Sequence, residues 1–210
     1  MKKNLPIYAL EISEDMNEDS GVSYVAMVDK PAIEADFFAF AESPMLLQFS
    51  GDDEMVIIGP AMIPDKPIYR NEDGREFFIT FSKEAIRRAA VKFFEQGFQK
   101  KINLMHSPDH KIEGVTIFQS FIKDEAKGVG GMVGDYPDGT WFLGAKVRNP
   151  EAWQLIKAGK VKGWSVEGLF KPKRTKLSID EVWNSLAALV ADVWQGRDSN
   201  PKGCGYLIII

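Results

Sequence analysis

Short apolar segments of strand type, each ended by a turn, dominate this sequence and constrain its fold most. They lie at residues 5–12, 22–28, 55–58, 76–81, 102–105, 115–122, 140–147 and 161–170. Glycine, proline, asparagine and aspartate fill the turns between them, as in 71–74 and 137–139. The pattern predicts a chain built mainly from short strands, in which the segment opening at 55–58 returns as 76–81 to make an antiparallel pair.

Three segments have helical spacing instead. The first is 83–96, with Ser82 as its N-cap and Gly97 as its stop. The second is 149–159, which begins at Asn149-Pro150. The third is 178–195, which opens with a capping box of Ser178 and Glu181 and carries a broad apolar stripe. We therefore expect an α+β fold.

The chain has 210 residues, which is the size of one domain with an appended segment. We divide it at the polar break around 50–53 and at the basic run 171–176. Residues 1–50 are then N-terminal strands and a connector, 51–172 a core, and 173–210 a basic linker followed by the amphipathic helix.

Charge and cysteine content argue against several classes of protein. The 26 basic and 30 acidic residues give a net charge of −4, so nucleic acid is not an expected partner, although a solvated linker at 171–176 forms a local basic patch. The single cysteine, Cys204, fits a reducing, intracellular setting. The apolar runs are too short for a signal peptide or a membrane span, so we expect a soluble protein that is not exported.

The two histidines focus the search for chemistry, because His106 and His110 both lie in the segment 103–110. His106 directly follows the apolar strand 102–105, and a general base needs such a rigid support. Metal binding by His106, Asp109, His110 and Glu113 is a rival interpretation. Pro108 argues against a continuous helix that would place both imidazoles on one face, so no metal and no cofactor is predicted.

Ser165 lies in a strand segment, Gly163 to Gly168, that differs from the nucleophile elbow of α/β-hydrolases in its glycine spacing. Side chains two apart on a strand share a face, so Ser165 and Glu167 point one way. Trp164 and Val166 point the other way. A serine in a strand is usually structural, and the spacing alone does not make this one a nucleophile.

Several motifs, taken in order, resemble the phage prohead (capsid maturation) proteases, in particular their XkdF-like branch. The matching stretches are Gly59–Arg70, Phe81–Ile86, Asn103–His106, Gly139–Trp141 and Gly163–Gly168, together with Val28–Ile33 near the N-terminus. This resemblance implies a serine endopeptidase with a mostly antiparallel β-barrel flanked by helices, similar to the herpesvirus assemblin. His106 then matches the family's histidine and Ser165 its serine.

The third residue of such a site is less clearly marked. Related proteases orient the base with a histidine or a carboxylate, and no histidine follows Ser165. Glu167, Asp180, Glu181 and Glu113 are the candidates. We favour Glu167, although it lies close to Ser165 along the strand and its reach to His106 is open.

The resemblance also implies partners and a location. The substrates would be phage scaffold and major capsid proteins, cleaved inside an assembling procapsid in the cytoplasm of the bacterial host. A homodimer would be held by the helix 178–195. The alternative is a catalytically inactive structural or scaffolding module of the same fold.

Overall fold

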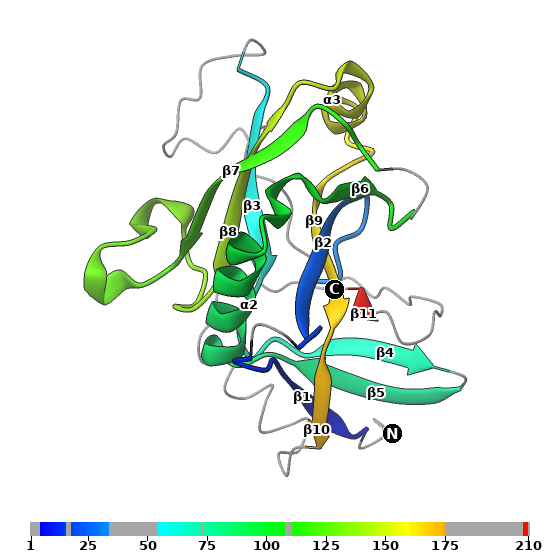
Figure 1. Cartoon of the computed structure of the whole chain (residues 1–210), viewed down its shortest axis with the longest axis vertical. Helices are drawn as coiled ribbons and strands as arrows, with labels where there is room; N and C mark the ends of the chain where they lie inside the picture. The colour runs from blue at the N-terminus through cyan, green and yellow to red at the C-terminus, as the bar shows by residue number, and fades with distance from the viewer. Residues whose placement is uncertain are drawn as a thin grey trace.

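The computed structural model describes residues 5–15, 18–33, 54–72, 74–107, 111–174 and 208–209. Its strands are β1 (Ile7–Glu11), β2 (Gly21–Val28), β3 (Val56–Met62), β4 (Ile68–Glu72), β5 (Arg75–Thr80), β6 (Ile102–Leu104), β7 (Val115–Ile122), β8 (Trp141–Val147), β9 (Gly163–Leu169), β10 (Lys171–Arg174) and β11 (Ile208–Ile209). Two α-helices, α2 (Lys83–Glu95) and α3 (Pro150–Lys157), and three short 3-10 helices, η1 (Phe98–Lys100), η2 (Glu125–Lys127) and η3 (Gly131–Val133), complete the described elements (Figure 1).

The strands form three sheets. The first has the order β10-β1-β5-β4, the second β11-β9-β2-β6, and the third β3-β8-β7. Most neighbours are antiparallel, but β1 pairs with β5 and β2 pairs with β6 in parallel. The N-terminal strands β1 and β2 therefore lie within sheets that also contain strands from the second half of the chain (Figure 1).

One predicted strand pairing is wrong. The segment at 76–81 forms β5, but its antiparallel partner is β4, and β3 pairs with β8 instead. Burial explains this choice: almost every residue of β3 and β8 is buried, whereas only two of the six residues of β5 are buried. Two continuous apolar strands gain most by lying together in the interior of the fold.

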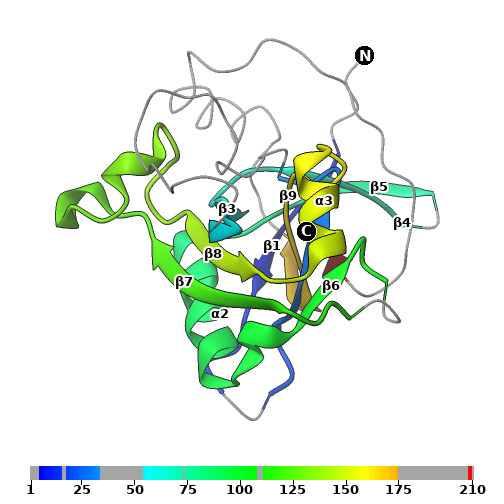
Figure 2. The same ribbon diagram turned by 90° about the horizontal axis from the view of Figure 1, so that it is seen from above.

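Both described α-helices confirm the predicted caps. Ser82 Oγ accepts from the amide of Ala85 at 3.1 Å, and Asn149 Oδ1 accepts from the amide of Ala152 at 2.9 Å. Helix α2 places Phe93 edge-on to Trp141 of β8, with ring centroids 5.8 Å apart. Figure 2 shows α2 and the β4–β5 hairpin on opposite sides of β1. The third predicted helix, 178–195, lies outside the described residues.

The fold is α+β, as predicted, but the expected barrel is not closed. Among the described strands the hydrogen-bonded ladders end at the edges of three open sheets. Strand β9 packs beside β3, yet each belongs to a different sheet. No helix in the described part of the chain is long and apolar enough to span a membrane.

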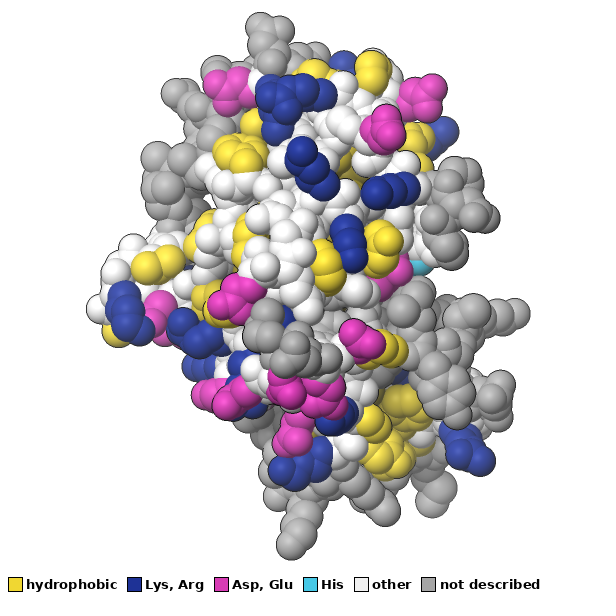
Figure 3. Space-filling model, in the orientation of Figure 1, with side chains coloured by type: hydrophobic (Ala, Val, Ile, Leu, Met, Phe, Trp, Pro, Cys, Tyr) yellow, Lys and Arg dark blue, Asp and Glu magenta, His cyan; other side chains and the backbone are white. Residues whose placement is uncertain are grey.

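The basic run is not wholly the linker that its composition suggested. Residues Lys171–Arg174 form β10, which pairs with β1, and Lys173 Nζ lies 3.0 Å from Glu11 Oε1. Lys171 pairs with Glu18, and Lys92 of α2 is buried and donates to the carbonyls of Asp15 and Glu18 at 2.9 and 2.6 Å. Acidic and basic side chains accordingly lie next to each other on the face shown in Figure 3.

Candidate active site

Strand β9 supplies two of the predicted site residues. Its residues are buried from Gly163 to Gly168, and Ser165 and Glu167 point to the same face because they are two positions apart. On the other face, Trp164 donates its indole N–H to the carbonyl of Leu143 at 3.1 Å. This buried anchor and the seven-residue ladder to β2 fix the direction in which Ser165 and Glu167 point.

His106 is positioned by a tight turn after β6. Met105 and His106 both have left-handed backbone conformations, with φ of 52° and 57°. Two hydrogen bonds hold this turn: the Met105 amide donates to Met27 of β2 at 3.0 Å, and the Ser107 amide donates to Leu104 at 3.1 Å. Left-handed residues other than glycine are uncommon and concentrate at functional sites. The turn brings the imidazole back to the sheet instead of extending the strand.

The imidazole of His106 meets the carboxylate of Glu167. Nδ1 of His106 lies 2.8 Å from Oε1 of Glu167, and the two side chains are 19% and 6% exposed. A carboxylate acceptor favours the tautomer with a proton on Nδ1, which leaves a lone pair on Nε2. Glu167 can therefore reach His106, because the turn after β6 carries the ring over the face of β9.

Asn103, which was not among the residues predicted for the site, also contacts Glu167. Its Nδ2 donates to Oε1 of Glu167 at 2.6 Å, and the residue is 3% exposed. A polar residue inside the apolar strand 102–105 was the only signal of its role. Buried polar side chains are rarely tolerated without a partner, so an asparagine in that run indicates a specific contact.

The pKa of Glu167 is held below its ordinary value. Burial of the carboxyl is the largest single influence and raises the pKa. The hydrogen bonds from His106 and Asn103, with the charge of His106, together outweigh that effect. Glu167 is therefore an ionised acceptor at neutral pH.

Ser165 occupies the same row of the sheet as Asn103. Ala26 of β2 is in register with Asn103 on one side and with Ser165 on the other, so all three residues share a face. Ser165 is only 1% exposed. The arrangement thus places a serine, an imidazole and a carboxylate on one side of the sheet, with Nδ1 of the imidazole facing the carboxylate.

The other candidates for the third residue do not compete in the described structure. Glu113 is exposed, and its backbone carbonyl accepts from the side chain of Asn149 at 3.2 Å. Asp180 and Glu181 lie outside the described residues. Asp109 and His110, on which the rival metal site depends, also lie outside them. Among the described residues no cluster of three or more His, Cys, Asp or Glu side chains could hold a metal ion.

Comparison with known proteins gives a consistent result. A curated relative, the phage-like element PBSX protein XkdF of Bacillus subtilis (strain 168), is 28% identical over an alignment of length 158 that covers 70% of this chain and 52% of the relative. The chain thus spans about half the length of that relative. No solved structure matches the chain.

The family match covers the strands from β3 to β9. Residues 44–173 match the model of a family described as "Putative phage serine protease XkdF". This range includes Asn103, His106, Ser165 and Glu167, and it is more than half of the chain. The resemblance seen in the sequence motifs is confirmed, and the chain belongs to the XkdF family of phage proteins.

Proposed function

We propose that the protein is a serine endopeptidase that processes scaffold or capsid protein during phage procapsid maturation. The contact between His106 Nδ1 and Glu167 Oε1 carries this proposal, because it gives the imidazole the orientation that a general base needs. Ser165 lies on the same face of β9 as Glu167 and is the nucleophile that such a base would deprotonate. Membership of the XkdF family supports this assignment.

The proposed reaction is an acyl transfer in two steps. Nε2 of His106 takes the hydroxyl proton as Ser165 Oγ attacks the scissile carbonyl carbon, and the imidazolium then gives that proton to the leaving amine. Water, deprotonated by the same nitrogen, resolves the acyl ester and restores the serine. When the ester bond breaks, the imidazolium returns the proton taken from water to Ser165 Oγ. Glu167 remains ionised throughout and stabilises the imidazolium that forms in each step.

The proposed setting follows from the family and not from the site. The relative belongs to a phage-like element, which supports a role in phage assembly with the scaffold and major capsid proteins as substrates. Cleavage would then occur inside the assembling procapsid, in the cytoplasm of the bacterial host. A homodimer held by residues 178–195 is part of the same proposal.

A second candidate is an inactive structural module of the same fold. The burial of Ser165 favours it, because a residue that is only 1% exposed cannot meet a peptide bond unless the residues over it move. The two candidates differ in one property, which is whether Ser165 reacts.

Co-expression with the scaffold and major capsid proteins of the same phage tests the proposal. Intact mass measurement should show specific truncation products of the scaffold or major capsid protein when the full chain is present. Ser165→Ala and His106→Ala should each slow cleavage by on the order of 10⁴-fold or more, and the double variant should be scarcely slower than either, since the two residues act as a unit.

A reactive-serine probe provides the control that needs no substrate. A fluorophosphonate should add one label to the full chain, at the peptide containing Ser165, and none to Ser165→Ala. Ser120→Ala is the matched variant, because Ser120 lies on β7 and its hydroxyl accepts from Trp141 at 2.9 Å, away from the site. No label and no cleavage by folded full chain would select the inactive module.

A further inference from the structure

We propose that Asn103 is a positioning residue of this site, which sets the carboxylate of Glu167 in place for His106. The inference rests on the proposed function for its effect on rate, but the contact itself does not depend on catalysis. Asn103 and His106 both approach the same oxygen, Oε1 of Glu167, at 2.6 and 2.8 Å. The carboxylate is therefore held from two directions at a single atom.

The sheet explains why an asparagine is needed at this position. Strands β6 and β9 are not neighbours: β2 lies between them, so their backbones are about 10 Å apart at about 4.8 Å per ladder. Ala26, the β2 residue in register with Asn103, has only a methyl group above the sheet. Glu167 is in register with Tyr24, two positions before Ala26 on β2, so the side chains of Asn103 and Glu167 meet diagonally across β2.

Asn103 is also the more rigid of the two contacts to Glu167. Its backbone lies in β6 between the ladder to β2 and a bridge to Lys111. His106, in contrast, belongs to a turn of two left-handed residues beyond the end of the strand. We infer that Asn103 fixes the carboxylate, and that the imidazole then aligns with a target that is already in position.

The amide of Asn103 acts through its donor end. Its Oδ1 is buried and has no hydrogen-bond partner among the described residues, so the side chain's contribution to the site is the N–H group on Glu167. Donation to a carboxylate favours its ionised form. Asn103 thus keeps Glu167 charged as well as placed, and both effects support a proton on Nδ1 of His106.

Two variants separate donation from packing. Asn103→Asp has almost the same shape as asparagine but loses the amide donor and adds a second acid beside Glu167. Asn103→Ala removes the side chain. The matched control is Asn149→Ala, which removes another asparagine whose side chain makes two structural hydrogen bonds, one at the N-cap of α3 and one to the carbonyl of Glu113. That control should lose about 1 kcal/mol of stability without any effect on the site.

The first measurement is the proton resonance of the imidazole. In the full chain, the Nδ1 proton shared with a buried carboxylate should give a low-field signal in the ¹H NMR spectrum, absent in His106→Ala. Both Asn103 variants should move or broaden that signal, while Asn149→Ala leaves it in place. An unchanged signal in folded Asn103→Asp would overturn the proposal, whatever the enzyme activity.

The second measurement is the rate of labelling by a fluorophosphonate. A misplacement of about 1 Å costs about 100-fold in rate, so the saturating rate should fall about that much in both variants. The half-saturating probe concentration should stay constant, because Asn103 is buried and does not meet the probe. Wild-type labelling by both variants would refute the positioning role. If the full chain is not labelled at all, the proposed function fails. The NMR signal alone then decides whether Asn103 positions Glu167.

Discussion

Glu167 is held at a single carboxylate oxygen, which accepts from both Asn103 and His106. The carboxylate is buried, and such a charge is stable only where hydrogen bonds replace the lost water. These two donors do so, and they keep the pKa of Glu167 below its ordinary value. The stability of the protein should therefore depend on the ionisation of this residue.

Glu167→Gln tests that dependence on pH. The folded-state pKa of Glu167 is lowered, so its stabilising contribution is complete above the unfolded-state pKa and is lost as pH falls through the folded-state pKa. Melting temperatures measured between pH 7 and pH 3 should show the full chain above the variant at neutral pH, with the gap closing in acid. A gap that is constant over this range would contradict the expected ionisation.

Gly168 is a position at which the β2–β9 ladder leaves no room for a side chain. A Cβ atom there would lie 2.0 Å from the carbonyl oxygen of Gly21 on the backbone of the neighbouring strand. Backbone atoms cannot move aside as the end of a long side chain can. Gly168→Ala should therefore separate β2 from β9 near the bulge between Val22 and Tyr24, and destabilise the protein by more than about 3 kcal/mol.

Gly131→Ala is the matched control for this change. A Cβ at Gly131 meets no atom within 4 Å. Urea unfolding should show a stability within about 0.5 kcal/mol of the full chain for this variant. A Gly168→Ala protein that is equally stable would show that the two backbones are further apart than the structure places them.

The sequence indicated the candidate site residues better than it indicated the geometry that joins them. His106, Ser165 and Glu167 belong to chemical types that act in proteases, and two of them share a face by the simple period of a strand. The left-handed turn at Met105 and His106 carries no glycine, so nothing in the sequence marked it. The contact between Asn103 and Glu167 depends on β2 lying between β6 and β9, and no local sequence pattern specifies that strand order.

At the scale of elements, local signals predicted boundaries well and pairings poorly. Caps at Ser82 and Asn149 involve residues three apart, so both α-helices begin where the sequence indicates. The pairing of β3 with β8 joins residues about 90 positions apart, such as Val56 and Lys146. That choice depends on which strands are buried in the complete fold, and turn residues say little about it.

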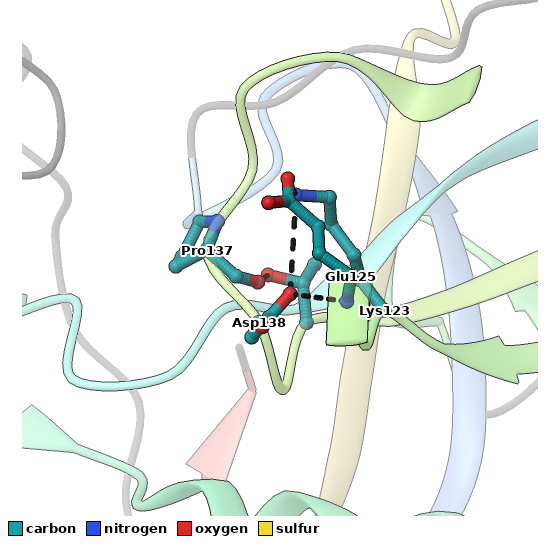
Figure 4. Close-up of polar contacts among 5 residues, drawn as sticks. Lys123, Glu125, Pro137 and Asp138 are labelled. Atoms are coloured by element: carbon teal, nitrogen blue, oxygen red, sulfur yellow. Dashed lines mark hydrogen bonds and ion pairs between the residues drawn. The ribbon is translucent and has the colours of Figure 1, made fainter. Parts of the chain in front are cut away.

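The connection from β7 to β8 is held by a buried lysine at its base. Lys123 is 3% exposed, and its Nζ lies 2.5 Å from Oε1 of Glu125 and 4.0 Å from Oδ1 of Asp138 (Figure 4). Asp138 also accepts from the amide of Glu125 at 3.0 Å, and the amide of Gly139 donates to the carbonyl of Lys123 at 2.8 Å. The two ends of the connection are thereby tied together.

Lys123→Met should loosen this connection without unfolding the protein. Methionine keeps the buried stem and removes the cost of burying a charge, while Glu125 and Asp138 are exposed enough to be hydrated. We expect a change of less than about 1 kcal/mol in global stability. Hydrogen exchange at the amides of Glu125 and Gly139 should become faster.

Lys127→Met controls for the loss of a positive charge in the same connection. The Lys127 side chain is 71% exposed and pairs with Asp124 three residues earlier. Exchange at the amides of Glu125 and Gly139 should stay as slow as in the full chain. Equal acceleration in both variants would mean that net charge, and not the buried contact, holds the connection.

For the whole molecule, the family resemblance predicted the class of fold but not how its sheets close. The described strands make three open sheets, in which β1 and β2 combine with strands more than 60 positions away. Closure of a barrel depends on tilt and register around the complete ring of strands. Those quantities depend on every strand at once, and a set of short motifs does not contain them.

The segment after β10 has an apolar sequence pattern that bears on the oligomeric state of the protein. Eight large apolar residues recur there at helical spacing: Ile179, Val182, Trp183, Leu186, Leu189, Val190, Val193 and Trp194. Each is worth about 1.5–3 kcal/mol when buried, so we expect this stripe to pack against a second copy of the chain. Light scattering should then give the full chain twice its mass of 23.5 kDa.

Two changes to the chain test whether this stripe is the interface. Truncation after Arg174 keeps β10 and should give a monomer. The double variant Leu186→Glu, Val190→Glu should also be a monomer, and because it is full-length it preserves every described strand. A full chain that is already monomeric would disprove self-association. If both altered chains aggregate, the stripe instead covers the protein's own core, because exposing that core would leave apolar surface in water.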